Sequence, residues 1–203
     1  HLTEASPDRL RKIFEVNVFG LTETTRVFLP MLKEGVKPAI VNISSIAARR
    51  GIPGRSEYSA SKFAVQGLSE ALRAELYKDG IDVLIVNPGL TQTNFSKNIL
   101  EQKAKFKLDH MRGMTSDEAA EGTLRAIEKG KNEATLTLKG KLLVFFSRFF
   151  PRLVDFIVRK KGTPVPLLSF FLNAGLLFAG IYFLTRKAVK DGLGARRTRI
   201  MRG

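Results

Sequence analysis

Residues 44–62 read SSIAARRGIPGRSEYSASK and place a tyrosine and a lysine, Tyr58 and Lys62, four positions apart. Apolar residues recur with helical period in the segment that follows, so both side chains are predicted to share one helix face. A phenol has an unperturbed pKa of about 10 and is a poor proton-transfer group near neutral pH, but a nearby ammonium favours the phenolate. The spacing therefore indicates a tyrosine that exchanges a proton.

A serine lies at a suitable distance from this pair. Ser45 precedes Tyr58 by thirteen positions, at the end of the apolar run AIVNISS, which is typical of a buried strand. A hydroxyl at the carboxyl end of a strand, facing the helix, would orient a carbonyl or alcohol. Taken alone, a Tyr-x-x-x-Lys pair is more often a packed tyrosine beside a solvated lysine, so the assignment depends on the combination.

Two further features complete the combination: Asn17 lies in VNVFG on the preceding predicted helix, and a strand is predicted at 81–87. With them the chain resembles the short-chain dehydrogenase/reductase family, whose Asn, Ser, Tyr and Lys tetrad matches Asn17, Ser45, Tyr58 and Lys62. The resemblance implies that Tyr58 is the general acid/base and that Lys62 lowers its pKa and holds the nicotinamide ribose. It also implies that Ser45 polarises the substrate oxygen and that Asn17, where the helix is disrupted, maintains a proton relay through a water.

The chain leaves strand 81–87 at Pro88-Gly89, on the carboxyl edge of the predicted sheet, where open α/β sheets bind ligands. By resemblance this turn belongs to the cofactor site, with the backbone around Leu90 and the hydroxyl of Thr93 contacting the nicotinamide carboxamide. On the residues alone, Thr93 is equally a loop residue whose hydroxyl caps a helix. The cofactor is expected to be NAD or NADP, and the sequence does not distinguish them.

The predicted elements alternate between helix and strand, which implies parallel strands joined by right-handed crossovers. The first helix is expected to begin with Ser6 as N-cap and Pro7 at the first helical position. Its apolar stripe is expected to comprise Leu10, Phe14, Val18, Leu21 and Val27. The helices are placed at 7–32, 56–78 and, after a capping box at 115–118, to about 128; the strands are placed at 39–44, 81–87 and 134–138, and a substrate lid is implied at 94–113.

The predicted fold class is α/β: a partial doubly wound, Rossmann-like parallel sheet over residues 1–140, followed by C-terminal amphipathic or transmembrane helices. No Gly-rich phosphate-binding turn follows a strand anywhere in the sequence. The resemblance therefore covers the second half of the family's domain, and roughly a hundred residues are expected to be missing upstream. The chain begins with His1 and is expected to be a fragment.

Basic charge is concentrated at the C-terminal end. The whole chain carries a formal net charge of +15; from Lys139 onward there are fourteen Lys or Arg against two acids, a net +12, which leaves +3 for the first 138 residues. The chain has no cysteine and only two histidines, so disulfides and a Cys or His metal site are not expected. A basic tail interleaved with apolar residues favours anionic lipid over nucleic acid as a partner.

Residues 141–161 are predicted to form two short amphipathic helices separated at Pro151. Their phenylalanines are expected to point into lipid or a partner, and these are Phe145, Phe146, Phe149, Phe150 and Phe156. Residues 165–184 are twenty consecutive uncharged residues, enough to cross a bilayer. A transmembrane span, an interfacial or hairpin insertion, and a buried dimerisation helix all remain open, and Gly175 and Gly180 are compatible with a homodimer.

The sequence thus predicts an NAD(P)-dependent oxidoreductase that acts on a carbonyl or alcohol of an apolar substrate. Membrane lipid is the expected partner, nucleic acid is not, and the catalytic domain is expected on the cytoplasmic side of a membrane. The alternative is a membrane-anchored interaction protein built on a dehydrogenase scaffold without turnover. The four matching tetrad residues favour the enzyme, because a scaffold has no chemical need for them.

Overall fold

The computed structural model describes residues 6–93 and 113–161, and for 159–161 only the backbone. The chain divides into two compact units, His1–Pro151 and Arg152–Gly203. The sequence had placed a boundary after residue 140. The predicted lid, apart from Gly113, and the uncharged segment 165–184 lie outside the described residues, and their assignments stay predictions.

The first predicted helix is present, but its middle turn is wider than an α-helix. Helix α1 (Pro7–Phe14) leads into a π-helical segment, η2 (Glu15–Gly20), and then into α2 (Leu21–Lys33). Pro7 occupies the first turn as predicted, whereas the side chain of Ser6 makes no capping hydrogen bond. A π turn inserts one residue into the helical repeat, which shifts the buried face. The predicted stripe is accordingly wrong at Val27, which is 65% exposed, and it is also wrong at Leu10, which lies before the π turn and is 41% exposed.

The sheet contains three parallel strands in the order β1-β2-β3. They are β1 (Ala39–Ile43), β2 (Asp82–Asn87) and β3 (Glu133–Thr135). Ala39 is paired with Asp82, and Ile85 with Glu133. The last strand is shorter than predicted, because the Thr137 hydroxyl accepts a hydrogen bond from the Gly140 amide and begins a helix instead. The parallel α/β arrangement itself is confirmed.

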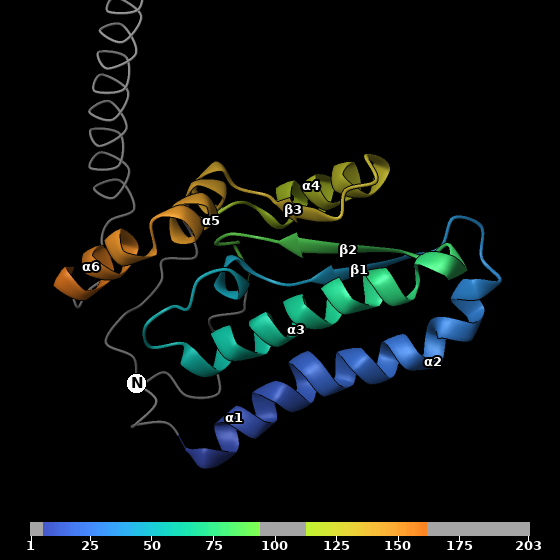
Figure 1. Ribbon diagram of the computed structural model, residues 1–203, viewed down its shortest axis with the longest axis horizontal. Helices are drawn as coiled ribbons and strands as arrows, with labels where there is room; N and C mark the ends of the chain where they lie inside the picture. The colour runs from blue at the N-terminus through green and yellow to red at the C-terminus, as the bar shows by residue number, and fades with distance from the viewer. Residues whose placement is uncertain (1–5, 94–112, 162–203) are drawn as a thin grey trace, which may run out of the picture. The chain divides into compact units, whose positions relative to one another are not determined.

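Helices cover both faces of this sheet (Figure 1). On one face, α3 (Ser56–Glu75) and α2 pack through Leu29, Leu32 and Leu72 against a core that includes Ile40 and Val83. On the other face, Ala126 of α4 (Ser116–Glu128) packs against residues that include Leu84 and Val86. Because consecutive β2 residues point to opposite faces, both faces are apolar, as expected of a covered parallel strand.

The predicted helix ends are largely confirmed. Helix α3 and a short 3₁₀ turn, η4 (Tyr77–Asp79), stop at Gly80, whose φ of 69° is the left-handed conformation that favours glycine. Helix α4 begins with the predicted capping box, in which Thr115 and Glu118 satisfy each other's backbone amides.

Two short helices follow the sheet, separated at Pro151 as predicted: α5 (Leu138–Phe149) and α6 (Pro151–Lys161). Phe145 and Phe149 are 43% and 60% exposed, but Phe146 is buried. The prediction that Phe146 points outward is therefore wrong, because one side of α5 packs into the body of its unit. Among the helices within the described residues, none is long and apolar enough to cross a membrane.

Candidate active site

Ser45 begins a tight turn at the carboxyl end of β1. The turn is a single 3₁₀ helix, η3 (Ile46–Ala48), and the Ser45 hydroxyl accepts a hydrogen bond from the Ala47 amide at 3.1 Å. The amides on either side of Ser45 are anchored to the end of β2: Ser44 N donates to Val86 O at 2.7 Å, and Ile46 N donates to Pro88 O at 3.3 Å. The serine is therefore fixed where two strands end.

Tyr58 and Lys62 lie in the first turns of α3, one helical turn apart as predicted. The Lys62 Nζ atom is 5.9 Å from the centroid of the Tyr58 ring. It also donates a hydrogen bond to the carbonyl oxygen of Ile43 at 3.1 Å. Because Ile43 is the last residue of β1, this bond holds the lysine beside the strand that leads to Ser45.

Asn17 lies in the π-helical segment, so the predicted disruption of the helix at this residue is present. Its Nδ2 donates to the hydroxyl of Ser61 at 3.0 Å, and that hydroxyl donates to the Tyr58 carbonyl oxygen at 2.9 Å. Ser61 is fully buried and lies between Tyr58 and Lys62 in sequence. Asn17 thus reaches α3 through Ser61, a residue that the sequence analysis did not select.

Burial governs the ionisation of the tyrosine and the lysine. It raises the pKa of Tyr58, while the hydrogen bond with Ser45 and the positive charge of Arg55 act in the opposite direction. Burial also lowers the pKa of Lys62. The causes of the net upward shift are burial, Ser45 and Arg55, and the prediction that Lys62 lowers the pKa of Tyr58 stays a prediction.

Arg55 is a second residue that sequence reasoning missed. It lies three positions before Tyr58, at the N-terminal boundary of α3, and its charge favours the phenolate form of that tyrosine. Desolvation lowers the pKa of Arg55 itself. A basic residue just before a helix that begins with a reactive tyrosine was a usable signal, since it lies within one helical turn.

The predicted cofactor loop leaves β2 and passes close to α5. A Cβ at Gly89 would lie 2.8 Å from the Thr137 hydroxyl, so only glycine fits there without a shift. Further along, Met114 N donates to Leu90 O at 2.9 Å. The bond from Ile46 N to Pro88 O brings Pro88 and Gly89 to the Ser45 turn. Thr93, in contrast, is exposed at the end of the described segment.

A cavity of about 490 Å³ adjoins this group. It is lined by Asn17 and Lys62 together with residues of α2 and β1, among them Phe28 and Ile40. Ser45 and Tyr58 are not among its lining residues, so it reaches the site from the side of the π-helical segment. Among the described residues, no group of three or more acidic, histidine or cysteine side chains could hold a metal ion.

Comparison with known proteins places the chain in a family: the short chain dehydrogenase profile matches residues 1–104, and the chain belongs to this family. The mouse protein named dehydrogenase/reductase SDR family member 7B is 36% identical over 131 residues, which cover 63% of this chain and 41% of the relative. The Xenopus laevis protein of that name is 34% identical over 156 residues, 74% of this chain and 48% of the relative. The chain thus spans less than half the length of these relatives.

Solved structures agree on the fold. A short chain dehydrogenase from Burkholderia cenocepacia in complex with NADP has a TM-score of 0.65 and 30% identity, with 74% of this chain and 60% of that chain covered. A short chain dehydrogenase/reductase from Burkholderia phymatum in complex with NAD has a TM-score of 0.64, with 75% and 62% covered. Its 24% identity supports the fold alone.

Proposed function

We propose that this chain carries the catalytic half of an NAD(P)-dependent oxidoreductase that interconverts a carbonyl and an alcohol. The observation that supports the proposal is the convergence of Ser45, Tyr58 and Lys62: a serine turn at the end of β1, hydrogen-bonded to a tyrosine whose neighbouring lysine bonds back to β1. These groups can hold a substrate oxygen and exchange a proton with it. A purely structural cluster does not require this set.

The residues present suit the nicotinamide end of a dinucleotide. In this proposal Lys62 holds the ribose, and the backbone around Leu90 and the hydroxyl of Thr93 contact the nicotinamide carboxamide. The fit is supported by the turn at Pro88-Gly89, which leaves the carboxyl end of β2 and is held beside the Ser45 turn by the bond from Ile46 N to Pro88 O at 3.3 Å. NADP and NAD are bound by solved relatives, and both remain candidates here. When bound, the nicotinamide supplies or accepts the hydride at the substrate carbon.

The protein residues would manage the proton. In the direction of reduction, the Tyr58 hydroxyl donates its proton to the substrate oxygen, and the Ser45 hydroxyl donates a hydrogen bond to the same oxygen. The charge of Lys62 stabilises the phenolate that is left, and Arg55 acts in the same direction. Asn17 contributes through Ser61, which fixes the start of α3. In the oxidation direction the same steps run in reverse.

The proposed substrate is apolar and the proposed partner is membrane lipid, and both are supported by α5. Its exposed Leu138, Phe145 and Phe149 are spaced seven and four residues apart, so they share one helix face. Lys141 and Arg148 are exposed on the same helix, whose sequence contains no acidic residue. Such a surface suits the interface of an anionic bilayer. The catalytic unit would then work beside a membrane, on its cytoplasmic side, and a homodimer is compatible with this.

Isotope transfer tests the reaction class. The full-length protein is supplied with NADPH or NADH carrying deuterium at the transferring position and with aldehydes and ketones of increasing apolar length. The proposal predicts deuterium on the alcohol carbon, and Ser45→Ala should reduce its appearance while cofactor binding persists. If neither cofactor transfers deuterium to any carbonyl, the oxidoreductase function is ruled out, and the alternative of a non-catalytic interaction protein is favoured.

Liposome flotation tests the lipid surface. Phe149→Ser should weaken binding to vesicles that contain phosphatidylserine, whereas Val36→Ser should not, although Val36 is 94% exposed. Equal losses for the two variants would exclude a specific role for α5. Retention of DNA at the same salt, with no binding to vesicles, would favour nucleic acid instead.

A further inference from the structure

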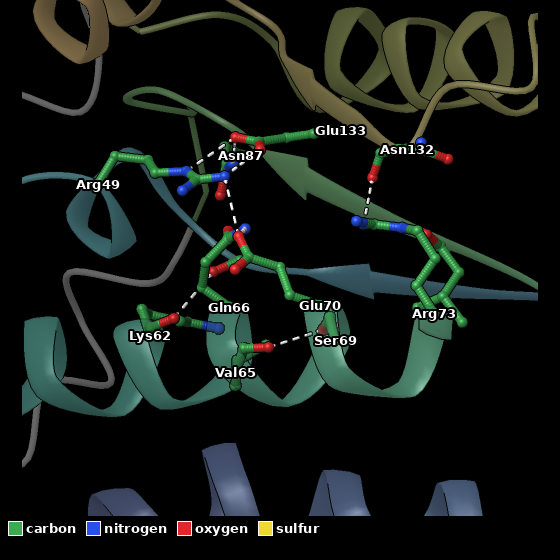
Figure 2. Close-up of polar contacts among 12 residues, drawn as sticks. Arg49, Lys62, Val65, Gln66, Ser69, Glu70, Arg73, Asn87, Asn132 and Glu133 are labelled. Carbon is green, nitrogen blue, oxygen red and sulfur yellow. Dashed lines mark hydrogen bonds and ion pairs between the residues drawn. The ribbon is translucent and has the colours of Figure 1, made fainter. Parts of the chain in front are cut away.

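A polar cluster links the serine turn after β1 to β3, at the other edge of the three-stranded sheet (Figure 2). It begins at Arg49, the residue that ends the turn begun by Ser45. Arg49 Nε donates to Glu133 Oε1 at 2.9 Å, and Nη2 donates to Glu133 Oε2. Nη2 also lies 3.4 Å from Glu70 Oε1 on α3. The guanidinium therefore holds Glu133 with two parallel bonds and touches α3 with a third.

Both carboxylates are oriented by amides. The fully buried Asn87, at the end of β2, donates from Nδ2 to Glu133 Oε1 at 2.9 Å. On α3, Gln66 Nε2 donates to Glu70 Oε1 at 2.7 Å. Since Glu133 is the first residue of β3, the cluster links the turn after β1 to the end of β2 and the start of β3. Each carboxylate that accepts from Arg49 therefore also accepts a hydrogen bond from an amide side chain.

The position of Arg49 along the chain gives this cluster its importance. The start of the turn is anchored by backbone bonds to β2, but the segment after Arg49 is a loop that contains Gly51 and Gly54. Gly54 has a φ of 75°, a left-handed conformation. The Arg49 side chain thus anchors the end of the serine turn, where the chain enters a glycine-containing loop that leads to Tyr58.

We infer that Arg49, held by Glu133, is a positioning residue that keeps the Ser45 turn at hydrogen-bonding distance from Tyr58. The inference rests on the proposed function and deepens it, because it explains how two site residues on different elements keep one geometry. Arg49 touches neither substrate nor cofactor in this account. Its guanidinium suits the task because a planar fork bonded to a carboxylate fixes direction as well as distance.

The Arg49–Glu133 pair is expected to fix the geometry of the site more than to stabilise the fold. Arg49 and Glu133 are 26% and 31% exposed, and ion pairs with this much contact with water contribute little to the free energy of folding. A small displacement of a catalytic group, in contrast, costs much in rate. Loss of the pair should therefore appear in catalysis before it appears in the melting temperature.

The test compares Arg49→Ala with Arg73→Ala in the full-length protein. Arg73 is a matched control: it donates to Val83 O at 2.9 Å and to Asn132 O at 2.8 Å, next to Glu133, but it does not reach the serine turn. Arg49→Ala should lower kcat by about tenfold with the cofactor KM unchanged. Arg49→Lys, which cannot form the fork, should recover only part of the loss, and Arg73→Ala should keep the wild-type kcat.

A second readout is the pH profile of alcohol oxidation, in which Tyr58 acts as the base. The Ser45 hydrogen bond lowers the pKa of Tyr58, so loosening the turn raises that pKa and moves the rising limb of the profile to higher pH. Glu133→Gln should move the limb in the same direction, and its amide oxygen still accepts from Asn87. A limb that stays in place in both variants, or that moves equally in Arg73→Ala, overturns the inference.

Hydrogen exchange separates this failure from failure of the proposed function, because it needs no turnover. The Ala48 amide bonds to Ser45 O at 2.9 Å inside the turn. Exchange of the peptide that contains Ala48 should be faster in Arg49→Ala and unchanged in Arg73→Ala. If Arg49→Ala exchanges faster and the protein shows no hydride transfer, the positioning role of Arg49 is supported and the proposed function is refuted. Unchanged exchange in Arg49→Ala refutes the positioning role whatever the activity.

Discussion

Gly140 is the position where adding one methyl group should disturb the site most sharply. It lies in the first turn of α5, and a Cβ there would lie 2.8 Å from Thr137 Oγ1, 2.9 Å from Thr135 Cγ2 and 3.0 Å from Ile46 Cγ2. The two threonine contacts are too short for an unshifted side chain, and the contact with Ile46 is tighter than ordinary packing. Ile46 is the residue after Ser45, so the methyl group would press directly on the serine turn.

The size of the effect follows from these contacts. Overpacking in a filled interior costs about 1–3 kcal/mol, and disturbing the Thr137 cap adds about 1 kcal/mol, while replacing glycine by alanine in a helix returns at most about 1 kcal/mol. Gly140→Ala should therefore lower the free energy of unfolding by about 1–3 kcal/mol. Gly67→Ala is the matched control, because no atom lies within 4 Å of its Cβ position on α3. That change should stabilise the fold by about 0.5–1 kcal/mol.

The assay is hydrogen exchange of the β2 amides, which reports on this unit separately from residues beyond Pro151. Gly140→Ala should speed exchange of the peptide that contains Ile85 and Val86, and Gly67→Ala should slow it. Activity should fall with Gly140→Ala and stay at the wild-type level with Gly67→Ala. If both variants shift exchange in the same direction, the close packing of α5 against the serine turn is refuted.

Two further predictions concern a helix start and the ionisation of the site. Thr115→Ala removes the capping box of α4 and should lower the free energy of unfolding, measured by urea denaturation, by about 1 kcal/mol. Thr123→Ala removes only a hydroxyl that bonds to a carbonyl of the same helix, so it should leave the free energy of unfolding unchanged. Equal effects of the two changes would contradict the stabilising role of the cap. Ser45→Ala removes the hydrogen bond that lowers the pKa of Tyr58, so the rising limb of the pH–rate profile for alcohol oxidation should move to higher pH. A limb at the wild-type pH would show that the two hydroxyls do not interact.

Local sequence pattern was enough to predict the elements that carry the site. The run AIVNISS and the helical period after Tyr58 located β1 and α3, and parallel connection of the elements brings a strand end to a helix start. The Lys62 bond to Ile43 O is a direct outcome of that geometry. The cap of α4 was also predictable, because Thr115 and Glu118 interact within one turn.

Contacts between distant residues were not predictable in the same way. Asn17 meets Ser61 across 44 positions, and Arg49 meets Glu133 across 84. No periodicity encodes which polar residue of one element meets which residue of another, so these pairs required the structure. The prediction that Val27 lies on the buried face of its helix was wrong for a related reason, because the π turn at 15–20 shifts the residues after it around the helix axis.

The ionisation of Tyr58 shows a third limit of the sequence. The sequence predicted that Lys62 lowers the pKa of Tyr58, but the net direction of the shift depends on how far the phenol is removed from water. Burial raises its pKa more strongly than Ser45 and Arg55 lower it. Only the packing around the ring reveals this balance, since neighbouring residue types do not determine burial.

The rate of a single hydride transfer in Tyr58→Phe, compared with Tyr77→Phe, decides whether Tyr58 is the proton-transfer group. Tyr77 is a suitable control because it is 82% exposed, on the short turn after α3. The account predicts that Tyr58→Phe slows transfer by about 10²- to 10⁴-fold with cofactor affinity retained, while Tyr77→Phe matches the wild type. Transfer at the wild-type rate in Tyr58→Phe would contradict the assignment of this site.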